Sequence, residues 1–259
     1  MSRGGAIVTL RQNRYSLRRE LIPAYCKEPV LSSQETPSAG RKNDPVGLKK
    51  RIFASALAEF AESGLNGARL EKIAEHADTT KRMVVYHFKN KEALYISVLE
   101  HVYGQIRRHE VSLNLAALPP AEALVKLVEA SFNFHVQNAD FIRVICMENM
   151  MRGRYIRQST QIKTLNRSAL TVLEDILSRG KQGGLFRADV AARDVHRLIS
   201  SMSFHQAANQ YTFDTLFEGN SQDESYIAHF RQIAVQVTLR FVTLQLLMLT
   251  LLMLTLVMR

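Results

Sequence analysis

The 259-residue sequence has no tryptophan and only two cysteines, which excludes several classes of protein. Cys26 and Cys146 lie far apart, outside any Cys-x-x-Cys or Cys/His ligand spacing. A disulfide framework and a zinc site are therefore excluded, and a reducing compartment such as the cytoplasm fits this cysteine usage. The N-terminal residues carry arginines but no apolar block, so we expect no secretory signal.

The short motifs of common enzymes are also absent. The sequence has no Gly-x-x-x-x-Gly-Lys-Ser/Thr loop, no Gly-x-Gly-x-x-Gly turn and no Gly-x-Ser-x-Gly nucleophile motif. We therefore expect no catalytic residues, no cofactor and no metal. A helical enzyme or ligand carrier with an unfamiliar site is the alternative that this absence leaves open.

Basic residues outnumber acidic ones along the chain. Lys plus Arg is 34 against 24 for Asp plus Glu, which gives a formal net charge of +10. An excess of this size favours a polyanionic partner, either nucleic acid or an anionic membrane surface.

Hydrophobic periodicity predicts an all-α fold. From Pro45 onward apolar residues recur at helical spacing, and no segment keeps the two-residue alternation of a half-buried strand. Proline and glycine pairs separate the helical segments. The pattern predicts helices over 45–63, 70–76, 81–88, 91–115, 120–138, 140–151, 158–180, 189–210 and 223–245.

Local capping signals fix the ends of the first helices. Asp44 is an N-cap ahead of Pro45, and Gly64 can adopt the left-handed conformation that ends a helix. Thr80 and Asn90 are N-caps for the helices that begin at residues 81 and 91. Asp78-Thr79 is expected to form the tight turn between two short helices.

The two short helices at 70–76 and 81–88 predict a DNA-reading unit. Such a unit must present the N-terminal half and one polar face of its second helix to the major groove. Lys81 and Arg82 supply donors at that position, while Val84 and Phe88 face a small core. The helix start after residue 90, with its free N–H groups and nearby lysines, is expected to bind phosphate.

At these residues the sequence resembles the TetR family of bacterial transcriptional regulators. The resemblance covers Arg51–Gly64, Leu70–Ala77, Lys81–Phe88 and Lys89–Leu94, and includes Tyr-His-Phe-x-x-Lys-Glu-Ala-Leu. The segment Phe141–Met150 resembles the effector domain of the pyrimidine-utilisation repressor branch. Together with the basic face, the resemblance assigns DNA contacts to Arg69, Thr80, Lys81, Arg82, Met83, Tyr86, His87, Lys89 and Lys91.

The family resemblance implies a fold and a mechanism. It implies an N-terminal three-helix helix-turn-helix domain followed by a helical ligand-binding and dimerisation domain. It also implies a homodimer that binds a palindromic double-stranded operator and leaves it when a small-molecule effector binds. We expect the two chains to pair through the helices at about 189–210 and 223–245. The turn Asp78-Thr79-Thr80 departs from the usual Gly-Val-Ser, and Ala68 stands where a Ser or Thr cap is common.

Polar and sulfur-bearing residues among the apolar positions of the later helices are candidates for the effector site. By analogy with the family they can line a cavity between helices, with aromatics for contact area and polar groups for orientation. The alternative for any one of them is an ordinary core position. The candidates are Phe134, His135, Met147, Asn149, Met150, Phe204 and His205.

The composition divides the chain into four parts. Residues 1–44 are expected to form a flexible basic arm, 45–92 the DNA-binding domain, 93–245 the effector-binding and dimerisation domain, and 246–259 an apolar repetitive tail. The arm either adds phosphate contacts or is a solvated extension. The uncharged stretch 241–258 approaches the length of a membrane span, so a membrane-tethered regulator, an extended dimerisation helix and an aberrant tail are the alternatives.

Overall fold

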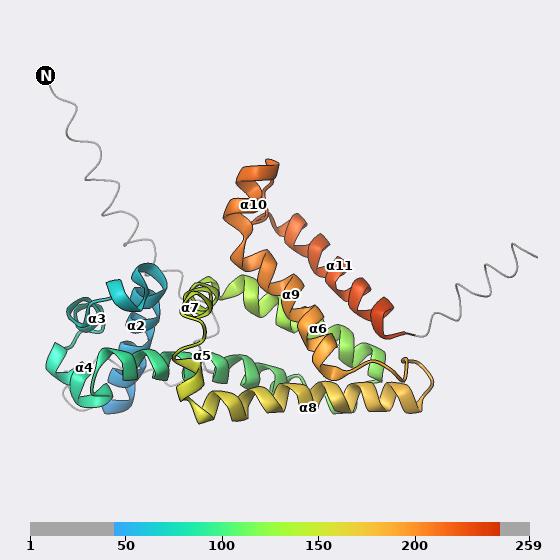
Figure 1. The fold of residues 1–259 in the computed structure, drawn as a ribbon, viewed down its shortest axis with the longest axis horizontal. Coiled ribbons are helices and arrows are strands. Elements are labelled where there is room, and N and C mark those ends of the chain that lie inside the picture. The colour runs from blue at the N-terminus through green and yellow to red at the C-terminus, as the bar shows by residue number, and fades with distance from the viewer. Residues whose placement is uncertain (1–43, 244–259) are drawn as a thin grey trace, which may run out of the picture. The chain divides into compact units, whose positions relative to one another are not determined.

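The computed structural model describes residues 44–243, which form helices joined by short turns, with one isolated bridge between Phe186 and Thr243 (Figure 1). The α-helices are α2 (Pro45–Gly67), α3 (Leu70–His76), α4 (Lys81–Phe88), α5 (Lys91–Ser112), α6 (Pro120–Gln137), α7 (Ala139–Met150), α8 (Thr160–Gln182), α9 (Ala192–Ala208), α10 (Gln210–Phe217) and α11 (Glu224–Val242). Two short 3-10 helices, η2 (Leu115–Ala117) and η3 (Ile156–Gln158), precede α6 and α8.

The predicted caps hold the first helices. The Asp44 carboxylate accepts the N–H of Gly47 at 2.8 Å. Gly64 takes the expected left-handed conformation at φ +66°, but it kinks α2 instead of ending it, and the helix continues to Gly67. Thr80 Oγ1 accepts the N–H of Met83 at 3.3 Å, while Asn90 Oδ1 accepts the N–H of Ala93 at 2.7 Å. Each side chain satisfies an N–H group that a helix start leaves without a backbone partner.

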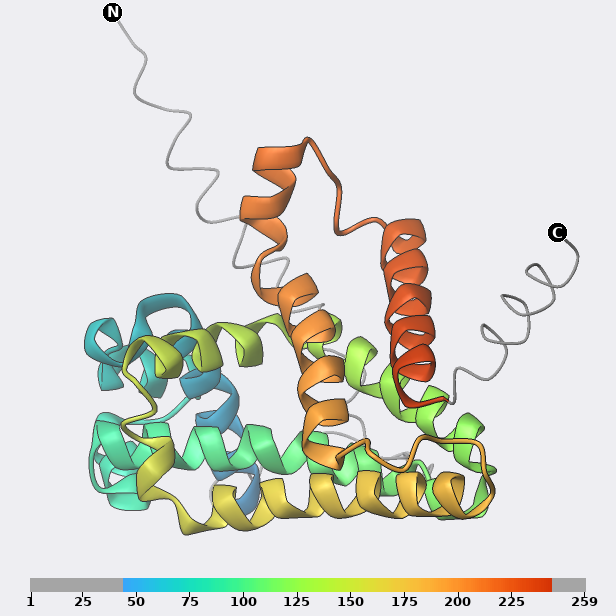
Figure 2. The same cartoon turned by 45° about the vertical axis from the view of Figure 1, so that its right-hand side comes forward.

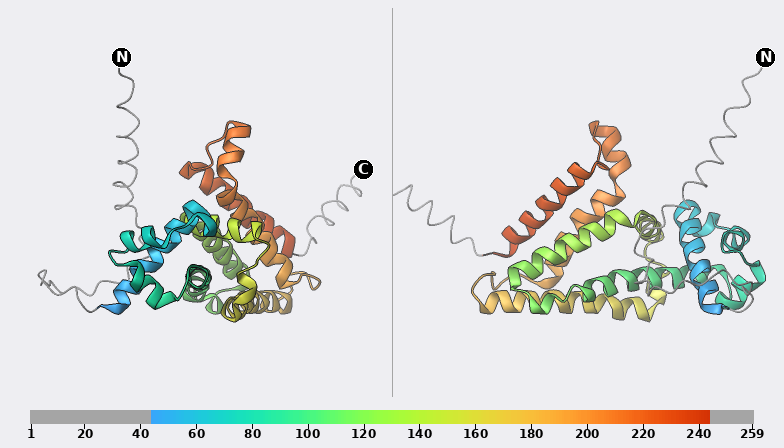
Figure 3. Two further views of the ribbon diagram at one scale, coloured as in Figure 1. Left: turned by 60° about the vertical axis from the view of Figure 1, so that its left-hand side comes forward. Right: turned by 180° about the vertical axis from the view of Figure 1, so that it is seen from behind.

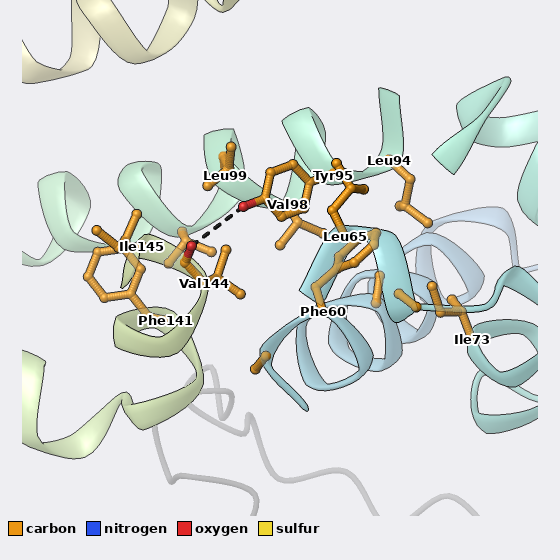
Figure 4. Close-up of a cluster of buried hydrophobic side chains, with 14 of the residues drawn as sticks. Phe60, Leu65, Ile73, Leu94, Tyr95, Val98, Leu99, Phe141, Val144 and Ile145 are labelled. Carbon is orange, nitrogen blue, oxygen red and sulfur yellow. Dashed lines mark hydrogen bonds between the residues drawn. The ribbon is translucent and has the colours of Figure 1, made fainter. Parts of the chain in front are cut away.

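One apolar cluster joins α2, α3 and α4 to α5 and α7. Figure 4 shows Phe60 and Ile73 on one side of this cluster, Tyr95 at its centre and Val144 on the other side. The ring of Tyr95 meets that of Phe60 edge to face at 5.1 Å, and its hydroxyl lies 3.5 Å from the carbonyl oxygen of Val144. The cluster is therefore continuous across the expected domain boundary at residue 92.

A second apolar cluster lies among α6, α8, α9 and α11. Leu124 and Phe132 of α6 meet Ile176 of α8 and Val195 of α9, and all four side chains are fully or almost fully buried. Figure 2 shows α11 beside α6 and α9, and the right-hand view of Figure 3 shows α8 running along α5. Helices α6, α8 and α9 contribute residues to both clusters.

Two predicted segments differ in the structure. The helix expected over 189–210 is α9, which ends at Ala208, and α10 then begins after Asn209 as a separate helix that the sequence pattern did not predict. The helix expected to reach residue 115 ends at Ser112, because Asn114 takes a left-handed conformation at φ +50°.

The expected basic arm, up to residue 43, and the apolar repetitive tail lie outside the described residues. Among the helices of residues 44–243, none is both long and apolar enough to cross a membrane.

Candidate nucleic-acid interface and ligand cavity

Helix α4 is held by one face and exposes the other. Val84 and Phe88 are buried in the first apolar cluster, whereas Lys81, Arg82 and Tyr86 are exposed, with Tyr86 at 78%. Met83 is half-buried between the two faces. Because the cap at Thr80 and the buried side chains fix the helix, its polar side is presented to solvent as a rigid surface.

Exposed basic side chains surround α4. Arg69, Arg82 and Lys89 are exposed, and none of them forms an ion pair with the described residues. Lys81 donates to the Glu71 carboxylate at 2.7 Å, and this hydrogen bond is the main cause of the lowered pKa of Glu71. The guanidinium and ammonium groups without partners are the ones readily able to contact phosphate oxygens.

Two predicted DNA contacts have different surroundings from those expected. The Lys91 ammonium donates to the carbonyls of Asn66 and Ala68 at 3.3 and 3.0 Å, so it closes the end of α2 rather than extending into solvent. His87 is half-buried against Tyr86, and its Nε2 is buried without a hydrogen-bond partner. Lys91 thus links the start of α5 to the end of α2, and the ring contacts of His87 among the described residues are with residues of its own helix.

A cavity of about 590 Å³ lies between α5, α6, α7, α8 and α9, within the size range of small-molecule sites. Its walls are Tyr103, Ile106, Arg107 and Glu110 from α5; Leu127, Ser131 and His135 from α6; Phe141, Ile145 and Asn149 from α7; Asn166, Ala169 and Leu173 from α8; and Arg193, His196, Arg197, Ile199, Ser200, Ser201 and Phe204 from α9.

A buried ion pair lies in the wall of the cavity. Arg107 Nη1 donates to Glu110 Oε2 at 2.6 Å, and the two residues are only 6% and 7% exposed. Burial raises the pKa of Glu110 to about 7, although the positive charge of Arg107 opposes the shift. Burial likewise lowers the pKa of Arg107. Both shifts follow from the cost of holding a charge away from water.

His135 is a neutral polar group in the same wall. Its Nδ1 lies 2.8 Å from the hydroxyl of Ser203. Burial is the main cause that lowers its pKa to about 4, with smaller contributions from Arg107 and His196. The imidazole therefore offers a hydrogen-bonding group without charge at neutral pH.

The predicted effector residues divide into two groups. His135, Asn149 and Phe204 line the cavity, and Phe134 is buried behind it, its ring 5.7 Å from that of Phe141. The remaining three candidates, Met147, Met150 and His205, do not line it.

The positions of these three residues follow from the helix faces on which they lie. Met147 is on the side of α7 that packs against Gly64 of α2, and Met150 is 84% exposed at the end of α7. His205 is exposed and its ring contacts Phe213 of α10 at 6.1 Å. The sequence did not predict the charged residues of the wall: Arg107 and Glu110 lie beside the apolar stripe of α5, where a charged side chain is usually solvated, and both are buried here.

Comparisons with known proteins identify the family. Residues 52–98 match the family model for "Bacterial regulatory proteins, tetR family", and residues 120–238 match that for "Tetracyclin repressor-like, C-terminal domain". The HTH-type transcriptional repressor NicS of Pseudomonas putida is 30% identical over 192 residues, which cover 74% of this chain and 91% of NicS. The chain belongs to the TetR family. The fold class predicted from the sequence is thereby confirmed, and this TetR-family protein is a DNA-binding transcriptional regulator.

Two further similarities extend the family comparison. The HTH-type transcriptional regulator RutR of Escherichia coli K12 is 42% identical over 66 residues, which cover 25% of this TetR-family protein and 31% of RutR. The crystal structure of FadR from Bacillus subtilis in complex with stearoyl-CoA has a TM-score of 0.59 at 18% identity, covering 74% of this chain and 98% of FadR. The likeness to FadR concerns the fold alone.

Proposed function

We propose that this TetR-family protein is a cytoplasmic, homodimeric repressor that binds a palindromic operator through α4 and releases it when a small molecule fills the cavity. The observation that carries the proposal is that two helices of the cavity wall, α5 and α7, also pack in the apolar cluster that holds the DNA-reading helices. The similarity to proteins named repressors supports the direction of regulation.

The DNA contacts come from the exposed side of α4 and its surroundings. Lys81, Arg82 and Tyr86 face the major groove and its edges, while Arg69 and Lys89 contact the flanking phosphates. Thr80 and Met83, at the start of the helix, approach the DNA backbone and the base edges respectively. When DNA binds, the Lys81 ammonium must either leave the Glu71 carboxylate or divide its N–H donors between Glu71 and the DNA. Arg82 has no such partner in the described part of the chain, so it contributes more to the affinity than Lys81.

A second copy of the chain covers the apolar surface of α10 and α11. Four residues of α10, together with two of α11, expose large apolar side chains, which a soluble monomer would leave in water. A two-fold dimer buries this surface and brings two α4 helices to one face of the DNA, which accounts for a palindromic operator. These residues are Tyr211, Phe213, Leu216, Phe217, Val237 and Phe241.

Ligand binding reaches the DNA-reading helices through α7 and α5. Phe141 and Ile145 of α7 line the cavity, while Met147 of the same helix packs against the kink of α2 at Gly64. A ligand that prefers one arrangement of α7 therefore also favours one position of α2 and, through the shared core, of α4. Differential affinity for the two arrangements is sufficient to release the operator.

The proposed function is tested by measuring binding to DNA from the protein's own upstream region. The double variant Lys81→Ala/Arg82→Ala should lose operator binding in a fluorescence anisotropy titration while the circular dichroism spectrum stays unchanged. The wild-type affinity should fall steeply as the salt concentration rises, because phosphate contacts release counterions. The matched control is Lys163→Ala/Arg167→Ala, which removes two exposed cations from α8 and should bind as the wild type does. Wild-type binding by the α4 variant would contradict the assignment.

A further inference from the structure

Positively charged side chains outnumber negatively charged ones among the described residues that line the cavity, and this excess indicates which class of ligand fits. Resting on the proposed function, we propose that the effector is an organic acid with an apolar body, and that Arg107 binds its anionic group. The inference identifies a ligand class and a specificity-determining residue for the cavity between α5 and α9.

Arg107 has donors that the protein does not use. It is 6% exposed, and its one hydrogen bond in the described part of the chain goes from Nη1 to Glu110. Its Nε–H is buried without a partner. A guanidinium has five N–H donors in a planar fork, and leaving them unmet in a buried wall costs free energy. An oxyanion in the cavity would satisfy them with the bidentate geometry that guanidinium groups favour.

The remaining charges favour the same sign of ligand. Arg193 and Arg197 also line the cavity, and within residues 44–243 neither forms an ion pair. Among the described residues of the wall, Glu110 is the one acidic residue, against three arginines. Its raised pKa means that its neutral form is accessible near neutral pH, so repulsion between Glu110 and a bound anion is readily relieved.

The rest of the wall suits an apolar body. Ile106, Leu127 and Ile145 provide aliphatic surface, while Phe141 and Phe204 provide aromatic surface. His135 is neutral and its Nδ1 is already hydrogen-bonded to Ser203. It therefore adds a polar group to the wall but no second positive charge that would draw the anionic group away from Arg107. A molecule that places an acidic group at Arg107 therefore has apolar contacts for the remainder of its surface.

Matched acid and amide pairs test the ligand class. The probes are benzoate with benzamide and octanoate with octanamide, which differ in charge but little in shape. Isothermal titration calorimetry on the full chain should show at least one acid binding about tenfold or more tightly than its amide, the factor expected for a charge-assisted hydrogen bond. Equal affinities within both pairs, or no binding of either acid, would overturn the proposal.

Paired variants test the role of Arg107. Arg107→Gln combined with Glu110→Gln removes both charges without leaving one of them buried alone, and it should abolish the preference for the acid. Arg108→Gln, the same change at the exposed neighbouring position of α5, should keep it. If the double variant does not fold by circular dichroism, Arg107→Lys provides the second test: it keeps the positive charge but removes the planar fork of donors, and it should weaken the acid preference severalfold. An unchanged acid preference in a folded variant of either kind would refute the assignment.

A separate measurement distinguishes this proposal from the proposed function. The acid that binds in calorimetry is added to the preformed complex with operator DNA, and release is followed by anisotropy. Acid binding without DNA release would leave the ligand class standing and would contradict ligand-controlled repression. DNA release by an amide as readily as by its acid would contradict the ligand class and leave the repressor mechanism standing.

Discussion

Burial changes the chemistry of His135. It is 7% exposed, and its pKa is lowered from 6.5 to about 4 chiefly because its charged form would lose its hydration in the wall of the cavity. In the unfolded chain the same imidazole is solvated. Between these two pKa values the unfolded state therefore holds more protons than the folded state.

The free energy of unfolding should consequently fall as the pH drops from about 6.5 towards 4, with the full contribution of His135 present above 6.5. We expect the wild type to lose roughly 1–2 kcal/mol more than His135→Asn between about pH 7 and pH 5, measured by urea unfolding. Glu110 acts in the opposite direction, because its raised pKa makes the folded state bind more protons over 4.5 to about 7, but it is common to both proteins.

His229→Asn, which removes an exposed imidazole from α11, is the control for this experiment. Parallel pH profiles for the wild type and His135→Asn would show that the buried imidazole does not carry the effect.

At the scale of helices, the sequence predicts helix bounds accurately where capping residues or turns lie at the helix ends. The bounds of α3 and α4 agree with the prediction at every residue, because Thr80, Asn90 and the turn at Asp78 act through atoms close by in the chain. The break at Asn209 was missed, since neither glycine nor proline marks it. Local signals therefore predicted the DNA-reading helices well.

The cavity was harder to predict because its walls come from five helices. Sequence periodicity shows which residues of one helix share a face, but not which faces meet. His135 and Phe204 were found through their residue type, whereas Arg107 was missed because a charged residue beside an apolar stripe is usually solvated. Met147 does not line the cavity, because α7 has two apolar sides, one towards the cavity and one towards α2.

The end of α8 depends on a close contact at Gly180. A Cβ at this position would lie 2.0 Å from a ring carbon of Phe186, whose side chain is only 2% exposed in the second apolar cluster. Gly180→Ala should therefore lower the free energy of unfolding by about 2–3 kcal/mol, because the buried ring has little room to move. Thermal and urea unfolding would measure the loss.

Gly183→Ala is the matched control for the same helix end. A Cβ there would have its nearest neighbour at 3.5 Å, an ordinary contact, and the residue has φ −78°. We expect this variant to stay within about 0.5 kcal/mol of the wild type. Equal stability of the two variants would indicate that Phe186 repacks freely.

At the scale of the whole molecule, the exposed apolar surface of α10 provides the test of dimerisation. Leu216 and Phe217 are 74% and 67% exposed, and a charged residue at either position would be stranded inside the proposed interface. Leu216→Glu/Phe217→Glu should be monomeric by light scattering, with operator affinity lowered about a hundredfold or more as the second half-site contact is lost.

Val111→Glu is the control for that change. Val111 is 70% exposed on α5, so its substitution places one glutamate, where the double variant places two, at an exposed apolar position on another helix. It should remain dimeric and bind DNA as the wild type does. A dimeric Leu216→Glu/Phe217→Glu variant would place the interface elsewhere.

The apolar cluster around Tyr95 limits how such regulators can be recombined. The Tyr95 ring lies against Phe60 of α2 and, at 5.4 Å, against Tyr155. A chimaera that joins the DNA-binding domain of one regulator to the effector domain of another at residue 92 would place side chains in this cluster that do not fit each other. Grafting a foreign operator preference should succeed better when only the solvent-facing positions of α4 are exchanged and the shared interior is kept whole.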